Sequence, residues 1–206
     1  ILSTKNEKGL NLERFFSDTP NLKSIGALNV EKISEATNFV SNCGMEDFSF
    51  LNIQSISSMV AMFRDSNIKD MTTIRNYQEL IGNTTNLYQC FQHSKLTSVP
   101  DLNIEKATSF FSAFDSCKQL VNVGNITIAK QGDAGAMFCN CSNLTAIGNI
   151  TGVNITKARQ MFQNCQSLAT VEALVLSKAT DICFLFTGTA KLTSIQSLDI
   201  SSFTHD

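Results

Sequence analysis

The chain has 206 residues, of which 43% are hydrophobic and 17% are charged. Its 16 Lys and Arg residues nearly balance its 18 Asp and Glu residues, and this balance argues against a nucleic-acid-binding or polybasic membrane-binding surface. No apolar run approaches the length of a transmembrane helix, so we expect no direct membrane insertion of the visible chain. The chain opens at Ile1 and stops at Asp206 partway through a coil, which predicts a fragment of something longer.

Phenylalanine recurs along the chain at a nearly constant interval. The members of this series are Phe16, Phe39, Phe63, Phe91, Phe114, Phe138, Phe162 and Phe186. Consecutive members lie 23, 24, 28, 23, 24, 24 and 24 residues apart. A fixed interval of this size is typical of a solenoid, in which each repeat packs only on its neighbours. We therefore predict one solenoid of about eight coils over residues 1–206, with the phenylalanines in a central column.

Two periodicities alternate within each coil. Apolar and polar residues alternate in Asp101–Ile104 and Ser197–Ile200, which predicts a short strand with one buried face. Further along the coil, apolar residues come every third position, as in Ala107, Phe110 and Ala113. That spacing favours a short 3₁₀ or α turn. Each coil should then add one strand to a parallel sheet and one helical turn to the opposite side.

The third coil, which starts at Phe63, is four or five residues longer than the others. Matching Tyr77 and Leu80 to the strand positions of other coils places the extra residues near 71–76. Insertions in repeat proteins usually leave the scaffold as loops, and such loops often bind partners. Arg75, Tyr77 and Glu79 are therefore candidate contact residues, and an insertion without a role is the alternative.

A polar strip is expected on the outward face of the predicted sheet, because residues at two strand positions are mostly amides and hydroxyls. Its candidate partner-binding members are Asn29, Asn52, Asp101, Asn103, Asn125, Thr127, Asn149 and Thr151, with Phe50 as the one aromatic. Stacked about 5 Å apart, these side chains would form a surface suited to a protein or a glycan. The alternative is a solvated sheet whose side chains bond only to one another.

Four of the seven cysteines fall on or next to one repeat position: Cys43, Cys117, Cys141 and Cys165. A regular place in the repeat favours a packing role for the thiols, because free cysteine behaves as a small buried hydrophobe. A disulfide framework remains the alternative. Cys139 and Cys141 are too close in sequence for a zinc pattern, and no His accompanies them.

No pattern of catalytic residues stands out. The two histidines, His93 and His205, have no recognisable nucleophile and carboxylate arranged around them in sequence. The glycines are scattered without a phosphate-loop lysine, and the acidic residues form no calcium loop. We therefore expect no enzymatic activity, no cofactor and no metal site.

The repeat resembles that of the BspA-like leucine-rich-repeat surface proteins, in the branch that carries Met-Phe-x-x-Cys-x-x-Leu. The motif stands at 161–168 and 137–144, and a leucine-rich core of the type Leu-x-x-Leu-x-Leu stands at 171–176, 195–200 and 25–30. The resemblance covers about Leu12 to Phe203, although the Asp-x-Ser-x-Val-Thr-x-Met run of that branch is mostly lost. It implies a leucine-rich-repeat-like solenoid with a strand and a 3₁₀ or α turn in each coil of 23–24 residues.

The resemblance also implies a function, since such repeats are found in adhesion and binding modules of surface proteins. We expect a non-enzymatic module, extracellular or on a cell or virion surface, that binds a protein or glycan on another cell. Two alternatives remain open. One is a structural spacer or receptor-binding component of a larger particle such as a phage tail. The other is an intracellular interaction scaffold, in which seven reduced cysteines would be stable.

Overall fold

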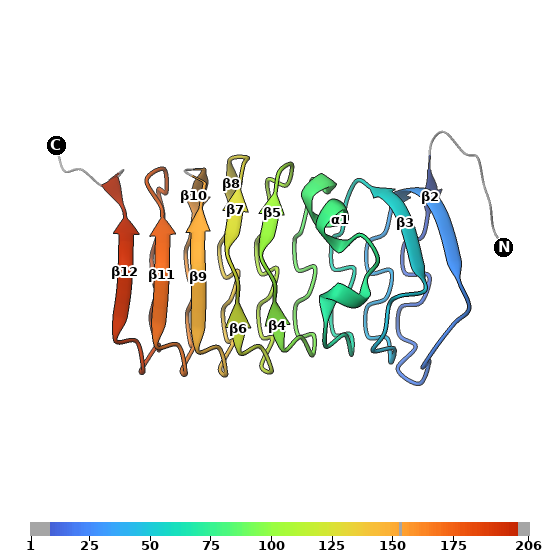
Figure 1. The fold of residues 1–206 in the computed structure, drawn as a ribbon, viewed down its shortest axis with the longest axis horizontal. Helices are drawn as coiled ribbons and strands as arrows, with labels where there is room; N and C mark the ends of the chain where they lie inside the picture. The colour runs from blue at the N-terminus through green and yellow to red at the C-terminus, as the bar shows by residue number, and fades with distance from the viewer. Residues whose placement is uncertain (1–8, 153, 202–206) are drawn as a thin grey trace.

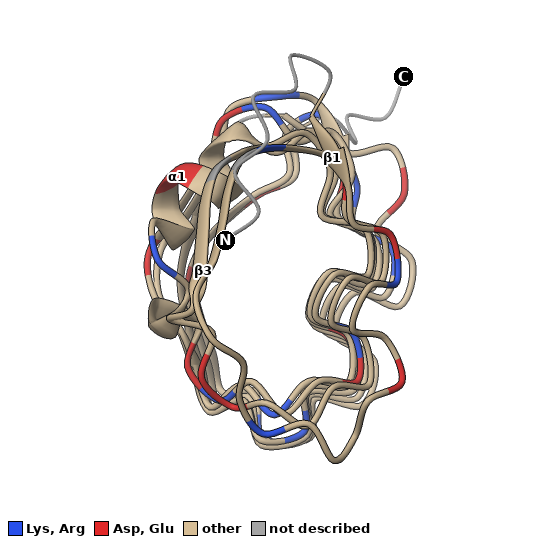
Figure 2. Cartoon of the chain, turned by 90° about the vertical axis from the view of Figure 1, so that its right-hand side faces the viewer, with Lys and Arg blue, Asp and Glu red and all other residues tan. Residues whose placement is uncertain are grey.

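The computed structural model describes residues 9–152 and 154–201, which form a parallel β-solenoid of about eight turns (Figure 1). Viewed along its axis, the coils superimpose on one another around a common interior (Figure 2). No Lys, Arg, Asp or Glu side chain that the structure describes is buried. The prediction of a repeat solenoid is confirmed. Phe203 and His205 lie outside the described residues.

The largest sheet contains seven parallel strands from the C-terminal half of the chain. These strands are β4 (Ser98–Val99), β5 (Leu102–Ile104), β6 (Asn122–Val123), β7 (Ile126–Ile128), β9 (Ala146–Thr151), β11 (Thr170–Val175) and β12 (Ser194–Asp199). Val171 on β11 pairs with Ile147 on β9 and with Ile195 on β12, so identical repeat positions lie side by side. The strands expected at 101–104 and 197–200 are therefore present, and the second begins three residues earlier than predicted.

The other strands form two smaller parallel sheets. The N-terminal sheet contains β1 (Leu10–Asn11), β2 (Leu28–Glu35) and β3 (Leu51–Ile56) in that order. A two-stranded sheet pairs β8 (Gly132–Asp133) with β10 (Ile155–Lys157). It lies beyond the ends of the main strands, where the chain has turned the corner of the coil (Figure 1).

The long third coil, from Phe63 to Phe91, has helices in place of its strand and separates the two larger sheets. Its helices are η1 (Met71–Thr73) and α1 (Tyr77–Asn83), and α1 lies on the outside of the sheet wall between β3 and β5 (Figures 1 and 2). The predicted position of the insertion is thus correct. The strand predicted around Tyr77 and Leu80 is wrong, because Asn76 takes a left-handed conformation (φ 60°) that redirects the chain into α1.

The opposite side of the solenoid differs from the prediction of one helical turn per coil. Each coil there has two residues with positive φ, four positions apart, as at Gln160 and Asn164 (both φ 60°). A helix requires negative φ at every residue, so this pair divides the segment into successive β-turns. The N–H groups of Gln160, Phe162 and Asn164 instead donate to the carbonyls of Cys183, Leu185 and Thr187 in the next coil, at 2.8–3.0 Å. Inter-coil hydrogen bonds therefore continue around the turn side.

The phenylalanine column is confirmed over most of its length. Consecutive rings from Phe63 through Phe186 stack with centroids 5.2–5.8 Å apart and interplanar angles of 1–9°. The second coil is the exception, since its left-handed residues Asn38 and Asn42 bracket Val40 rather than Phe39. Phe39 instead tilts against Phe16, and Phe48 meets Phe63 edge-on at 5.1 Å.

Three cysteines, Cys117, Cys141 and Cys165, form a second row beside the phenylalanines. The thiol of Cys165 donates to the carbonyl of Phe138 at 3.0 Å, and Cys141 and Cys117 donate in the same way to Phe114 and Phe91. All seven cysteines are free, and six of them are buried. The packing role predicted for this position is therefore what the structure shows.

Candidate binding surface

Helix α1 is held on the sheet face by its own apolar residues and by two side-chain contacts to the following coil. Leu80 and Ile81 are buried, so one face of α1 belongs to the core. The amide of Gln78 donates to the Asp101 carbonyl at 2.8 Å, and the Lys106 ammonium donates to Asn83 Oδ1 at 2.6 Å. These contacts fix which side chains of α1 face outward.

Two open hollows flank α1. The first, of about 300 Å³, lies against β5 and the residues after it and is lined by Gln78, Glu79, Gly82, Asn83, Asn103 and Glu105. The second, of about 310 Å³, lies against β2 and β3 and is lined by Lys32, Ile33, Ser55, Ile56, Ser57, Glu79, Asn83 and Lys106. Glu79 and Asn83 line both hollows, so the insertion and the sheet build one continuous polar surface.

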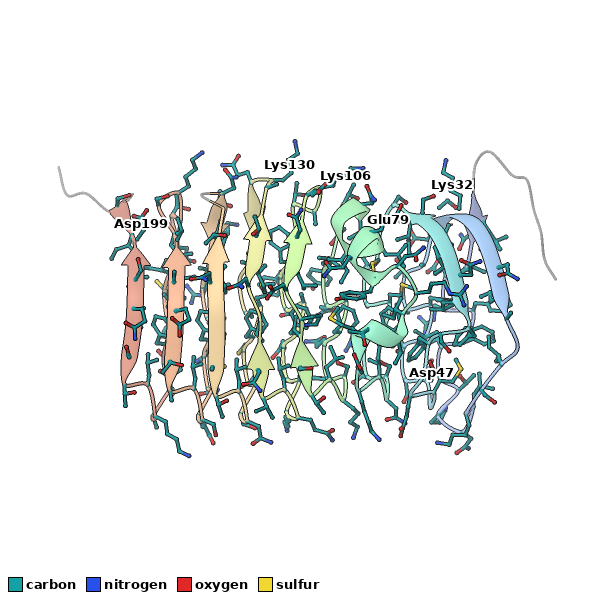
Figure 3. All side chains as sticks on the ribbon, viewed as in Figure 1. Lys32, Asp47, Glu79, Lys106, Lys130 and Asp199 are labelled. Atoms are coloured by element: carbon teal, nitrogen blue, oxygen red, sulfur yellow. The ribbon has the colours of Figure 1, made fainter. Side chains whose placement is uncertain are left out.

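The structure places the three insertion candidates differently. Glu79 is exposed and lies between the hollows (Figure 3). Arg75 is exposed in the segment between η1 and α1. Tyr77 is half-buried, packs against the core and accepts a hydrogen bond from Gln78 at 3.1 Å. Of the sheet candidates, Asn103 is the one that the fold brings to Glu79.

The strip members Asp101, Asn125 and Asn149 form a ladder across three coils. The Asn125 N–H donates to Asp101 Oδ1 at 2.7 Å, and the Asn149 N–H donates to Asn125 Oδ1 at 2.9 Å. Glycine precedes each of these asparagines because a Cβ on Gly124 would lie 2.4 Å from Asp101 Oδ1. The repeated Gly-Asn-Ile-Thr at 124–127 and 148–151 is the sequence signal for this ladder.

The remaining strip members also contact their neighbours. Asn52 donates to Asn29 at 3.1 Å, Thr127 and Thr151 hydroxyls lie 3.5 Å apart, and Asn103 donates to Glu105 at 3.0 Å. Phe50 is half-buried and packs against the core, with its ring 5.9 Å from that of Phe48. Many polar groups of the strip thus form hydrogen bonds with neighbouring side chains or backbone of the same sheet. The surface beside α1 differs, because it contains two hollows.

The buried thiols of the cysteine row are shielded from water. Burial raises the pKa of the Cys117 and Cys165 thiols to about 12, so both stay protonated at neutral pH. His93 is exposed and its Nδ1 lies 2.9 Å from Asp65 Oδ1. Within residues 9–152 and 154–201, no three His, Cys, Asp or Glu side chains gather where they could hold a metal ion.

The sequence of the chain matches the model of one protein family. A family model described as "Mycoplasma protein of unknown function, DUF285" matches residues 10–147 and 85–198. The chain belongs to the DUF285 family. The two overlapping matches agree with a repeat that recurs along the solenoid.

The DUF285 description carries no activity or partner to compare with the site. Neither the search of curated proteins nor the search of solved structures returned a match. In the part of this DUF285 chain that the structure describes, no helix has the length and hydropathy needed to cross a membrane.

Proposed function

We propose that this DUF285 solenoid is a non-enzymatic recognition module of an extracellular or cell surface, which binds a protein or glycan of another cell through the surface around α1. The observation that carries the proposal is the pair of hollows that share Glu79 and Asn83. The insertion puts α1 where the other coils have a strand. It thereby brings Glu79, a candidate of the insertion, next to Asn103, a candidate of the sheet strip.

The chemistry of this surface suits recognition of a polar partner. The hollows are lined by charged side chains of both signs, namely Lys32, Lys106, Glu79 and Glu105. They are also lined by the amides of Asn83 and Asn103, which can donate and accept hydrogen bonds. Mixed charges at a rim favour orientation and specificity over raw affinity. The likeness of the repeat to the BspA-like surface proteins supports the same proposal by analogy of fold, which is a weaker warrant than the site.

The test is a binding screen of the chain against surface proteins and glycans of host cells, with two charge-reversal variants. Glu79→Arg/Asn103→Arg changes the surface beside α1, and Glu13→Arg makes the same exposed Glu-to-Arg change in the first coil. Loss of binding in the first variant alone supports the proposal. Undiminished binding by the first variant would contradict the proposal, because the contact would then lie on another surface. No binding by the parent chain would favour the spacer role.

A further inference from the structure

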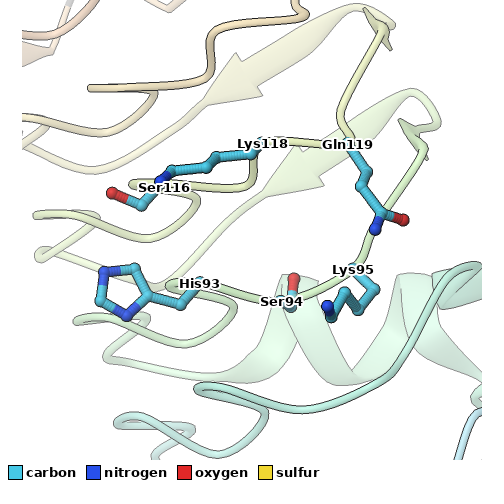
Figure 4. Close-up of a pocket in the computed structure, with 6 residues that line it drawn as sticks. All are labelled: His93, Ser94, Lys95, Ser116, Lys118 and Gln119. Atoms are coloured by element: carbon cyan, nitrogen blue, oxygen red, sulfur yellow. The ribbon is translucent and has the colours of Figure 1, made fainter.

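A second polar groove runs along the edge of the solenoid from which the chain enters the strands. One hollow, of about 320 Å³, is lined by residues of two adjacent coils, among them His93, Lys95 and Lys118 (Figure 4). Lys118 also lines a hollow of about 380 Å³ with Asn140, Ser142, Asn164 and Gln166. The two hollows therefore join at Lys118 into a groove that crosses four coils.

The positions of the groove residues are set by the repeat. His93, Asn140 and Asn164 each take the second left-handed position of their coil, with φ 58–60°. The side chain of Asn164 donates to Asn140 Oδ1 at 3.0 Å, and Asn140 donates to Asp115 Oδ1 at 3.2 Å. Because adjacent coils lie about 5 Å apart, the groove presents its polar groups at a regular interval along a straight line.

The groove carries unpaired positive charge. Within the described part of the chain, the ammonium groups of Lys95 and Lys118 have no ion-pair or hydrogen-bond partner. Among the described residues that line the two hollows, none carries a carboxylate. The nearby Asp115 carboxylate accepts hydrogen bonds from Gln92 at 2.8 Å and from Ser116 at 3.0 Å.

A second nearby acid, Asp65, lies against basic side chains. The Asp65 carboxylate lies 2.9 Å from His93 Nδ1 and 3.2 Å from Arg64 Nε. An anion in the groove would thus meet two lysines that form no ion pair in the described structure, near one carboxylate, that of Asp115, which neutral groups bond. Lysine acts as a compact point charge for carboxylate or sulfate, while amides and hydroxyls can bond to sugar hydroxyls.

We propose that this groove binds a linear acidic glycan lying across the coils. The regular spacing favours a repetitive polymer, and the amides of Asn140, Asn164 and Gln166 favour a polymer rich in hydroxyls. A nucleic acid is less suited, because no Phe, Tyr or Trp side chain lines either hollow among the described residues, and unpaired bases bind mainly by stacking on such rings. The groove shares no lining residue with the hollows beside α1, so it is a separate site.

The test measures the Kd of the full chain for heparin oligosaccharides at low and physiological salt. Lys95→Gln/Lys118→Gln should weaken binding roughly fivefold for each lysine removed, with a shallower salt dependence. The matched control, Lys130→Gln/Lys178→Gln, removes two exposed charges after β7 and β11, where the chain leaves the strands, and should change Kd by less than about twofold. Ser142→Glu/Gln166→Glu should abolish binding, because it adds two carboxylates to the groove.

Three outcomes would overturn the proposal. The first is no heparin binding, and the second is an equal loss in the control variant, which would indicate general electrostatic attraction. The third is tighter binding of single-stranded oligothymidylate than of heparin. None of these outcomes bears on the surface around α1, since all groove variants keep Glu79 and Asn103.

Discussion

At the scale of single residues, the fold depends on left-handed residues that are seldom glycine. Ala136, with φ 52°, is one of these residues, and a side chain in this conformation crowds its own backbone. We expect Ala136→Gly to raise the free energy of unfolding by up to about 1 kcal/mol in urea unfolding. Ala134→Gly, at a buried position without positive φ, should lower it by a similar amount. The same sign for both changes would contradict this account.

Ser66 provides a second test at this scale. It occupies the cysteine position of its coil, and its fully buried hydroxyl has no hydrogen-bond partner. Because an unpaired buried hydroxyl is costly, Ser66→Ala should raise the free energy of unfolding by about 1 kcal/mol. Ser94→Ala is the control, since the Ser94 hydroxyl lies 3.4 Å from Cys117 Sγ and should give no such gain. Chemical denaturation measures both, and a Ser66→Ala variant less stable than the parent would refute the assignment.

At the scale of elements, the cysteine row links stability to pH. Burial raises the pKa of Cys117 in the folded chain to about 12 from its ordinary value of 9.0. The folded state therefore holds the thiol proton more tightly, and this contribution is complete below pH 9.0 and is lost as pH rises toward 12.

The corresponding prediction compares the parent chain with Cys117→Ala. Between pH 9.0 and 12, the parent should lose more stability than the variant, by roughly 1.4 kcal/mol per pH unit for the missing thiol. Urea unfolding at pH 7 and pH 10 measures the difference. Identical losses in the two proteins would show that the Cys117 thiol does not titrate differently in the folded and unfolded states.

The helix α1 marks the limit of prediction from sequence at this scale. The repeat interval located the extra residues, because a longer separation between Phe63 and Phe91 can be counted. The helix itself could not be inferred from the apolar pattern, since Tyr77 and Leu80 fit either a strand or a helix until Asn76 turns the chain. The hollows beside α1 depend on residues of four coils, which only the tertiary fold brings together.

On the turn side, the three-residue apolar spacing predicts a helical turn, whereas positive φ at residues such as Gln160 makes successive β-turns. Both conformations return apolar side chains to one face at this interval, so spacing alone cannot separate them. The core was easier to predict, because every coil repeats the same buried positions. The second coil could not be predicted in this way, because Val40 takes the position that the column phenylalanine has in other coils. Phe39 fits the sequence interval equally well.

At the scale of the whole molecule, stability should depend on position along the array. Phe138 is fully buried and stacks between Phe114 at 5.3 Å and Phe162 at 5.8 Å, whereas Phe16 in the first coil is only half-buried. Phe138→Ala should cost roughly 3–5 kcal/mol, and Phe16→Ala should cost clearly less. Equal shifts in the denaturant midpoint would argue against coil stacking as the source of stability.

The most direct test of the proposed recognition surface is to remove α1 while keeping the solenoid. Asp70 pairs with Ser98, and Asn86 pairs with Ser109, so residues 71–85 correspond to the shorter segment 99–108 of the next coil. Replacing the first segment with a copy of the second should give a folded chain with a strand in place of the helix, which circular dichroism can verify. We predict that this chain no longer binds the partner found in the screen. Undiminished binding by the folded, helix-free chain would contradict the account.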